Sequence, residues 1–472
     1  MNQIPVKDVT PKSKGKAESY DLYAKREHIY VKFYKGLFKN FRTISGFLML
    51  VMFYGFSWIQ WDGHQAVLFD LPSRQFHVFG FTFWPQDFML LSWLLIILAF
   101  VLFFVTVFAG RLWCGYACPQ FVWTWFFMWA ERVTEGDRNQ RMRLDKAAWS
   151  GQKLAKKAAK HTLWLIIAAA SAIAFVGYFT PIRELSPAVF SWNLGPWETW
   201  WIGFLTVATY ANAGWLREQV CIYMCPYARF QSVMFDQDTL VISYDEKRGE
   251  NRGKRKKSAD YKAEGMGDCI DCNACVHVCP VGIDIRDGLQ YECVACGACV
   301  DACDDMMDRM GYDRGLVRYT TEHALDGGTT HIMRPRLIAY FICLCAMFIA
   351  FSYTLYSRIP LEVDIIRDRG QLFVEASNGK IENVYRLKLA NKSQDDHSYS
   401  IEVSGIDGLS MIGASEVVIR SGELLDHPVS LQIDPRFLEK SNYDIFFRVQ
   451  ALDDEDIVLE QENRFIGPAK RR

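Results

Sequence analysis

Five long stretches without Asp, Glu, Lys or Arg constrain this chain more than any other feature. They are residues 43–61, 88–110, 162–182, 199–216 and 337–357. A hydrocarbon core about 30 Å thick takes about 20 helical residues to cross, and a charge at its centre is costly. A buried helix of a soluble protein could explain one such stretch but not all of them. The pattern predicts a multi-pass α-helical membrane protein with about five spans, four of them within a membrane domain at 43–235.

Lysine and arginine are concentrated in two of the segments that flank the predicted spans. Residues 1–42 and 132–160 are rich in both, whereas 62–87 and 183–198 contain a single arginine each. Because basic residues favour cytoplasmic loops, we expect the N-terminal segment 1–42 to be cytoplasmic. An odd number of spans then places the C terminus outside the membrane. The net charge of −1 argues against nucleic-acid binding.

Eight of the 14 cysteines form two runs of the same spacing in the loop 236–335, before the fifth predicted span at 337–357. Each run reads C-x2-C-x2-C-x3-C, followed by Pro280 in the first and by Asp304 in the second. This spacing is typical of α+β bacterial ferredoxins with two [4Fe–4S] clusters, in which the fourth cysteine of each run ligates the other cluster. Zinc, the alternative for paired CxxC motifs, explains two identical runs poorly. We therefore assign one cluster to Cys269, Cys272, Cys275 and Cys303, and the other to Cys293, Cys296, Cys299 and Cys279.

A second cysteine motif, C-x-Y-x-C-P, occurs twice, each time after a span predicted to run from outside to inside. The copies are Cys114 to Pro119 and Cys221 to Pro226, 107 residues apart. If helical, each copy would place both thiols on one face, and its proline could end one helix or open the next. Cys114, Cys118, Cys221 and Cys225 could then converge into a thiolate site for Cu(I), zinc or a third Fe–S cluster. Structural thiols at a helix end are the plainer alternative.

From about residue 358 to 472 the hydrophobic pattern changes from helical to alternating, and cysteine is absent. Turn residues separate about seven short segments that read as strands. This pattern predicts an all-β immunoglobulin-like sandwich without a disulfide, a module usually used for contact or scaffolding. The segments are Leu361–Ile366, Val384–Leu389, Tyr399–Val403, Val417–Ile419, Val429–Ile433, Ile445–Val449 and Ile457–Glu460.

Motifs for other redox cofactors are missing from the sequence. The nine histidines all lie outside the charge-free stretches, and no C-x-x-C-H, G-x-G-x-x-G or P-loop occurs. These absences disfavour intramembrane haem, c-type haem and a nucleotide site. Electrons for the clusters would come from another protein or from a quinone, and the sequence does not identify the donor.

The combination of spans, two C-x-Y-x-C-P motifs, a two-cluster insert and a cysteine-free sandwich resembles the FixG/CcoG cytochrome c oxidase accessory proteins over nearly the whole chain. The resemblance implies a cupric reductase of the bacterial inner membrane that converts Cu(II) to Cu(I) and supports assembly of cbb3-type cytochrome c oxidase. Copper-delivery and oxidase assembly proteins would be its partners. The cluster domain would be cytoplasmic and the sandwich periplasmic. By this resemblance Cys114, Cys118, Cys221 and Cys225 form the candidate catalytic copper site.

Two other functions share part of this pattern. A polyferredoxin that takes electrons from quinol, like those that feed periplasmic nitrate reductase, would explain both cysteine motifs but not the sandwich. A non-enzymatic oxidase assembly factor would have structural clusters and an outer domain that holds an oxidase subunit.

Overall fold

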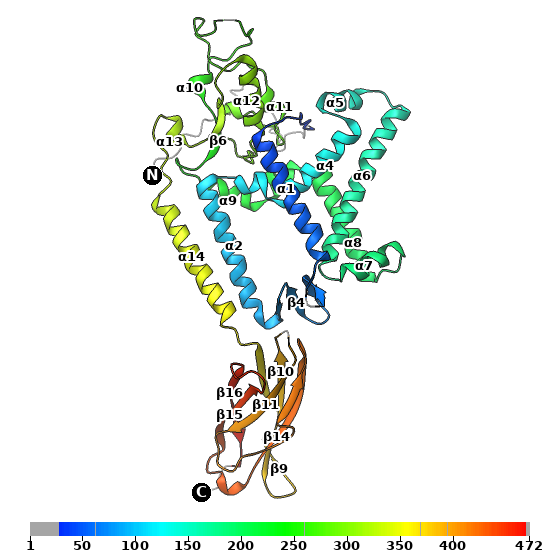
Figure 1. Cartoon of the computed structure of the whole chain (residues 1–472), viewed down its shortest axis with the longest axis vertical. Helices are drawn as coiled ribbons and strands as arrows, with labels where there is room; N and C mark the ends of the chain where they lie inside the picture. Colours follow the sequence, from blue (N-terminus) through cyan, green and yellow to red (C-terminus); the bar gives the residue numbers. More distant parts are fainter. Residues whose placement is uncertain (1–27, 62, 259, 369, 394, 469–472) are drawn as a thin grey trace, which may run out of the picture.

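The computed structural model describes residues 28–468, apart from 62, 259, 369 and 394. Most of the predicted N-terminal segment 1–42, with many of its basic residues, lies outside the described residues. Helices fill the middle of the molecule, between the cysteine-rich unit at one end and a β-sandwich at the other (Figure 1).

Within the described residues, three helices are long and apolar enough to cross a membrane: α2 (Phe88–Ala109), α6 (Gly151–Val176) and α14 (Pro335–Tyr356). Each corresponds to one of the charge-free stretches. Only 11% of the most apolar window of α2 and 6% of that of α14 is buried within the protein. A large exposed apolar surface of this kind marks contact with a membrane or a partner, and its length here fits a bilayer. The protein is therefore membrane-associated.

The other two charge-free stretches form helices that are too short or not apolar enough to count as spans by the same measure. The first belongs to α1 (Leu37–Gly55), which begins before the stretch and so includes Lys39 and Arg42. The second gives α8 (Pro196–Thr209), only 14 residues long, continued by the π-helix η3 (Tyr210–Leu216). The expectation of five spans is therefore not confirmed, because the absence of charge does not determine where a helix begins or ends.

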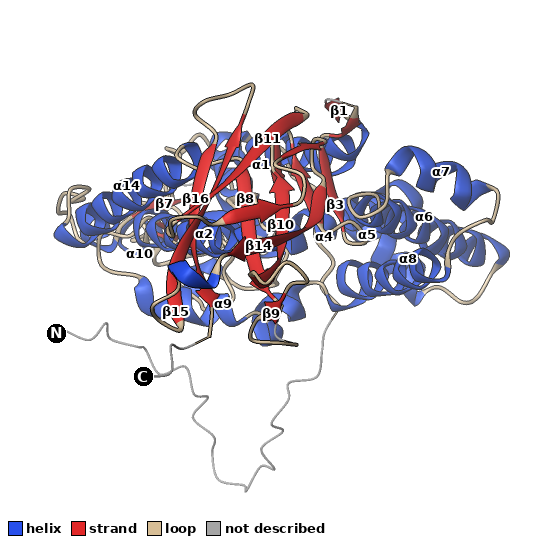
Figure 2. Ribbon diagram, turned by 90° about the horizontal axis from the view of Figure 1, so that it is seen from below, coloured by secondary structure: helices blue, strands red, loops and turns tan. Residues whose placement is uncertain are grey.

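The long helices pack in two groups. α2 packs along α14, whereas α4 (Pro119–Glu135), α6 and α8 pack together. The second group extends beyond the sandwich on one side (Figure 2). The remaining α-helices are α3 (Leu112–Tyr116), α5 (Arg138–Lys146), α7 (Ile182–Phe190), α9 (Pro226–Met234), α10 (Glu246–Gly249), α11 (Ala274–His277), α12 (Ala298–Met310) and α13 (Glu322–Leu325).

A buried carboxylate joins α4 to α5 and to the residue that follows η3. Glu131 of α4 accepts hydrogen bonds from Arg141 Nη1 at 2.6 Å and from Arg217 Nη1 at 3.3 Å. Glu131 is 2% exposed, and both arginines are 5% exposed. Because the three groups lie away from water, each charge depends on its partners for stabilisation.

We expect Glu131→Gln to lower the free energy of unfolding by about 3–5 kcal/mol, because it leaves two buried guanidinium groups without a counter-charge. The thermal unfolding midpoint of the detergent-solubilised protein measures this loss. Asp305→Asn is the control: its partner Arg309 is 68% exposed, so we expect a loss below about 1 kcal/mol. Equal losses for the two variants would contradict the prediction.

The C-terminal sandwich consists of two antiparallel sheets, and all seven predicted strands are present. Each predicted segment lies within or overlaps an observed strand, and β9 and β12 are additional strands too short to show an alternating pattern. One sheet contains β8 (Leu361–Arg367), β9 (Val374–Glu375), β10 (Ile381–Asn391), β12 (Ser410–Ile412) and β14 (Leu424–Ile433). The other contains β11 (His397–Ser404), β13 (Glu416–Ile419), β15 (Asn442–Ala451) and β16 (Val458–Ile466).

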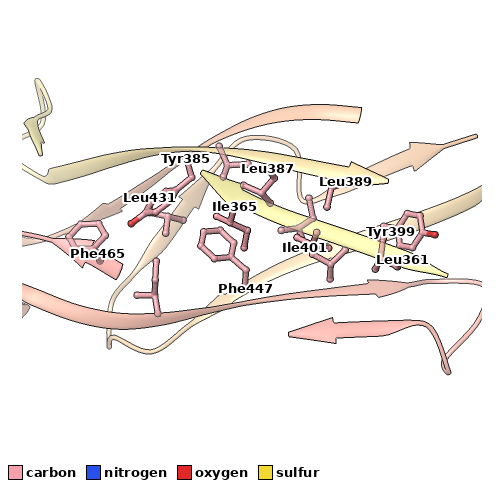
Figure 3. Packing of buried hydrophobic residues seen from close by; sticks show 14 of the residues in the cluster. Leu361, Ile365, Tyr385, Leu387, Leu389, Tyr399, Ile401, Leu431, Phe447 and Phe465 are labelled. Atoms are coloured by element: carbon pink, nitrogen blue, oxygen red, sulfur yellow. The ribbon is translucent and has the colours of Figure 1, made fainter. Parts of the chain in front are cut away.

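The sandwich core is formed by alternate residues of the strands, whose side chains point between the two sheets. Tyr385, Leu387 and Leu389 of β10 are fully buried between the sheets and face Phe447 and Phe465 of the other sheet (Figure 3). The phenolic hydroxyl of Tyr385 donates to the carbonyl oxygen of Arg464 at 2.8 Å. Since that polar group is satisfied, the ring can be buried at little cost.

A small sheet, which the sequence did not predict, connects the helices to the sandwich. Its strands are β3 (Val67–Asp70), β4 (Gln75–Val78) and β5 (Phe81–Phe83), beside the hairpin of β1 (Gln60–Trp61) and β2 (His64–Gln65). Gln75 Nε2 donates to Gly422 O of the sandwich at 2.8 Å. Asp87, just before α2, pairs with Arg358 at 2.6 Å and with Lys392 of the sandwich at 3.4 Å.

Candidate functional site

The two cysteine runs fold into a small α+β unit with an internal repeat. β6 (Val241–Tyr244) pairs with β7 (Val317–Thr320) before and after the runs. The first run leads into α11 and the second into α12. Asn273 (φ 55°) and Gly297 (φ 72°) occupy the left-handed region directly before these helices. This backbone conformation turns each run around a cavity.

Each of two cavities in this unit is lined by one of the predicted ligand sets. One cavity is lined by Cys269, Cys272, Cys275 and Cys303. A second cavity is lined by Cys279, Cys293, Cys296 and Cys299, and Cys275 also reaches it. The structure thus brings the fourth cysteine of each run beside the first three of the other run.

The cysteines around these cavities are buried or half-buried, apart from the exposed Cys272. Burial raises the pKa of Cys275 and of Cys303 to about 12 each. A thiolate in such a place needs a cationic group to stabilise it, and an iron–sulfur cluster binds four thiolates in this way. Met307, Leu316 and Val317 supply an apolar wall around the first cavity. The donors and their surroundings therefore fit a [4Fe–4S] cluster.

The two C-x-Y-x-C-P motifs have the same local structure, so the sequence repeat is also a structural repeat. Gly110 (φ 56°) and Arg217 (φ 46°) stand four residues before Cys114 and Cys221, respectively. Each is followed by one short helix, α3 in the first motif and the π-helix η4 (Val220–Met224) in the second. A left-handed conformation is costly for arginine, and such strain is often found at functional sites.

The two cysteines of each motif do not share one helix face, because the helix is interrupted between them. Cys118 has φ −65° and ψ 125°, and Cys225 has φ −80° and ψ 110°, so both are extended. They are the N-cap residues of α4 and α9, and the following proline opens each helix at its first position. Of the two roles considered for the proline, the structure shows the second.

The four motif thiols lie near one another. Burial raises the pKa of Cys114 to about 11 and that of Cys221 to about 12, and thiols of the other motif contribute to both shifts. Cys114 Sγ also donates a hydrogen bond to Gln231 Oε1 at 3.4 Å. Among the described residues, no three of these sulfurs fall within 4.8 Å of one another. They would therefore have to move closer to hold one ion with three or four thiolates.

The first motif packs directly against the loop between Cys293 and Cys296. A Cβ atom at Gly115 would lie 2.8 Å from the carbonyl oxygens of Val294 and Ala295, so a side chain there would force the two segments apart. The hydroxyl of Tyr319 donates to Ala295 O at 2.5 Å. Cys114 and Cys118 also pack in the same apolar cluster as Cys279 and Cys296. The thiol motif and the second cysteine cavity therefore share a wall.

Arg111, which the sequence interpretation missed, links both motifs to that loop. The residue is 6% exposed, and its guanidinium group donates to Cys293 O at 3.2 Å and to Ala228 O of α9 at 2.6 Å. On the same loop, the hydroxyl of Tyr291 donates to Ile222 O of the second motif at 3.4 Å. The only signal in the sequence was a lone arginine between an apolar stretch and a cysteine motif, which also fits an ordinary membrane-edge cation.

Fold and site define a class of protein: a membrane-associated iron–sulfur electron-transfer protein with two [4Fe–4S] clusters and an immunoglobulin-like C-terminal domain. The 4Fe-4S dicluster domain family matches residues 216–322. The family described as an IG-like fold at the C-terminal of FixG matches residues 351–468.

The chain belongs to the FixG family. It is 40% identical over 427 residues to the nitrogen fixation protein FixG of Rhizobium meliloti, covering 83% of this chain and 82% of that protein. It is 40% identical over 408 residues to protein RdxB of Cereibacter sphaeroides, covering 84% and 85%. A crystal structure of a FixG-related protein from Vibrio parahaemolyticus is 34% identical over 24% of this chain and 98% of its own length, with a TM-score of 0.22.

Proposed function

We propose that this protein is a cupric reductase, which reduces Cu(II) to Cu(I) and so supports assembly of a cbb3-type cytochrome c oxidase. The observation that carries the proposal is the contact between the first thiol motif and the loop between Cys293 and Cys296. Thiolates bind Cu(I) better than Cu(II), so the four motif thiols favour the reduced product.

In this proposal the crossed cysteine sets would hold the two clusters, and each reduced cluster would supply one electron for the reduction of one Cu(II) ion. Cys114, Cys118, Cys221 and Cys225 hold the Cu(I) product. Gly115 permits the close approach of the first motif to the loop, and Arg111 fixes α9 and the same loop to the end of α2. The electron donor is a second protein or a quinol.

We further propose that the chain crosses the bacterial inner membrane five times, through α1, α2, α6, α14 and the rod formed by α8 and η3. The cysteine-rich unit would be cytoplasmic and the sandwich periplasmic. Their positions at opposite ends of the long helices support this arrangement (Figure 1). The basic residues of the segments 1–42 and 132–160 support the same orientation.

The test is anaerobic and uses the full-length protein. Its clusters are reduced with stoichiometric dithionite, excess reductant is removed, and Cu(II) is added with a Cu(I) chelator. We expect the cluster absorbance to return to that of the oxidised state, with about one Cu(I) captured per electron held by the clusters. Clusters that stay reduced with Cu(II), in a protein whose oxidised clusters are reduced by a quinol, would contradict the proposal and favour a quinol-linked electron carrier. Clusters that cannot be reversibly reduced would favour an assembly factor.

A further inference from the structure

Three metal-ligating side chains from distant parts of the sequence meet beside the end of α2. They are Asp238, just before β6, His323 of α13, and His331 in the segment between α13 and α14. One ligand atom of each lies within 4.8 Å of the other two, and no other such group of three His, Cys, Asp or Glu occurs among the described residues. The sequence interpretation gave none of the three a role.

The distances suit a shared metal ion. His323 Nδ1 lies 2.8 Å from Asp238 Oδ1, and His331 Nδ1 lies 3.6 Å from Asp238 Oδ2. Two ligand atoms that are each about 2.0–2.1 Å from one ion, at angles of about 90–110°, lie about 2.8–3.4 Å apart. The two imidazole rings stand at 86° to each other rather than stacking. Only small movements are needed to bring the three ligands around one ion.

Hydrogen bonds from the backbone hold the three residues in place. The His331 amide donates to Asp238 Oδ1 at 3.0 Å, and the His323 amide donates to Gln237 O at 3.2 Å. The nearby cation Arg334 is neutralised by an ion pair with Asp236. The group is therefore organised before any ion binds, and the charge of Arg334 is already balanced by Asp236.

The group is both open to solvent and close to the first thiol motif. The side chain of His323 is 38% exposed and that of His331 is 65% exposed, so a hydrated ion can reach them. Thr239 Oγ1 donates to Val107 O at 3.0 Å, and Leu240 N donates to Phe108 O at 3.1 Å. These bonds fix the segment that carries Asp238 to the last turn of α2, shortly before Cys114.

We infer that Asp238, His323 and His331 bind a divalent transition-metal ion, and that this ion is the Cu(II) substrate on its way to reduction. Imidazole nitrogen and carboxylate oxygen suit Cu(II), whereas the thiolates beyond α2 suit Cu(I). The two sites thus separate the oxidised substrate from the reduced product by ligand type. The identity of the ion as substrate rests on the proposed function, but the existence of the site does not.

The test measures Cu(II) binding under conditions in which Cu(II) cannot be reduced by the clusters. One equivalent of Cu(II) is added to the full-length protein with oxidised clusters, which are diamagnetic, and the Cu(II) electron paramagnetic resonance spectrum is recorded. We expect nitrogen hyperfine coupling from two imidazoles, and displacement of the signal only by a large excess of Zn(II), because such a site binds Cu(II) more tightly. The double variant His323→Ala/His331→Ala should lose this coupling and bind Cu(II) at least 100-fold more weakly.

The sandwich provides a matched control, because His397 pairs with Asp453 at 2.8 Å without a second histidine. His397→Ala should leave the spectrum and the affinity unchanged. Each single histidine variant serves as a check on folding and should lose one of the two nitrogen couplings at an unchanged unfolding midpoint. Equal Cu(II) affinity and equal spectra for the wild type and the double variant would overturn the inference.

Turnover separates this inference from the proposed function. If both hold, the double variant raises the KM for Cu(II) and leaves the Cu(I) yield at saturating Cu(II) unchanged. If the spectrum shows the two-imidazole site but the reduced clusters never reduce Cu(II), the binding site stands while its ion is not a substrate, and the cupric reductase proposal fails.

Discussion

Replacing Cys114 and Cys118 by serine should lower the rate of Cu(II)-dependent cluster reoxidation at least 100-fold, while both ferredoxin clusters still assemble. Serine keeps the size of the side chain but removes the soft sulfur that stabilises Cu(I). The first motif is also the one that packs against the loop between Cys293 and Cys296. Stopped-flow absorbance of the reduced protein mixed with Cu(II) measures the rate, and iron analysis measures assembly.

Two other cysteines provide the control. Cys343 and Cys345 are both exposed on α14, and the double serine variant there should reoxidise at the wild-type rate. Full activity of the Cys114/Cys118 variant would contradict the copper site. Iron analysis also separates the two occupants considered for these thiols. With copper the protein holds about eight irons before and after substitution, whereas a third cluster would add about four that the variant loses.

Replacing two of the cluster cysteines by alanine should remove one cluster if both line the same cavity. It should remove both clusters if the two cysteines line different cavities. Cys303 lines the same cavity as Cys269, although Cys303 belongs to the second run. We therefore expect Cys269→Ala/Cys303→Ala to lower the iron content from about eight to about four, no further than either single variant does. Cys293→Ala/Cys303→Ala, two changes within one run, should lose both clusters.

Iron content and the spectrum of the reduced protein measure this outcome. Cys279→Ala/Cys293→Ala is the mirror case and should retain the first cluster, because both residues line the second cavity. If substitutions within one run removed a single cluster and substitutions across runs removed two, the crossed assignment would be wrong.

Local patterns in the sequence predicted those parts of the structure that depend on near neighbours. The spacing of the cysteine runs predicted the crossed sets, because two runs of this spacing are typical of ferredoxins with two clusters, and the same cysteines line the two cavities. Alternation identified the seven strands of the sandwich, since each has one face toward the core. The motif prolines could not by themselves show that Cys118 and Cys225 cap new helices.

The features that sequence did not predict all depend on contacts between distant residues. Arg111 has a role only because Cys293 and Ala228 are folded against it. Nothing in the sequence distinguishes Gly115 from the other glycines among the 32; only its close approach to Val294 shows why a side chain is excluded there. The sequence could not predict the left-handed conformation of Arg217, because arginine rarely adopts it. The ends of α1 and α8 were missed for a related reason, since hydrophobicity predicts burial in lipid rather than helix length.

The ion pairs of Asp87 have a mechanical consequence. Arg358 and Lys392 fasten the sandwich to the residue that precedes α2, and the thiol motif begins just beyond the other end of this helix. An α-helix of 22 residues is about 33 Å long and resists bending. The sandwich and the thiols are therefore attached to opposite ends of one stiff helix. A partner protein that binds the sandwich and tilts it would therefore shift the thiols at the other end of α2 without contacting them.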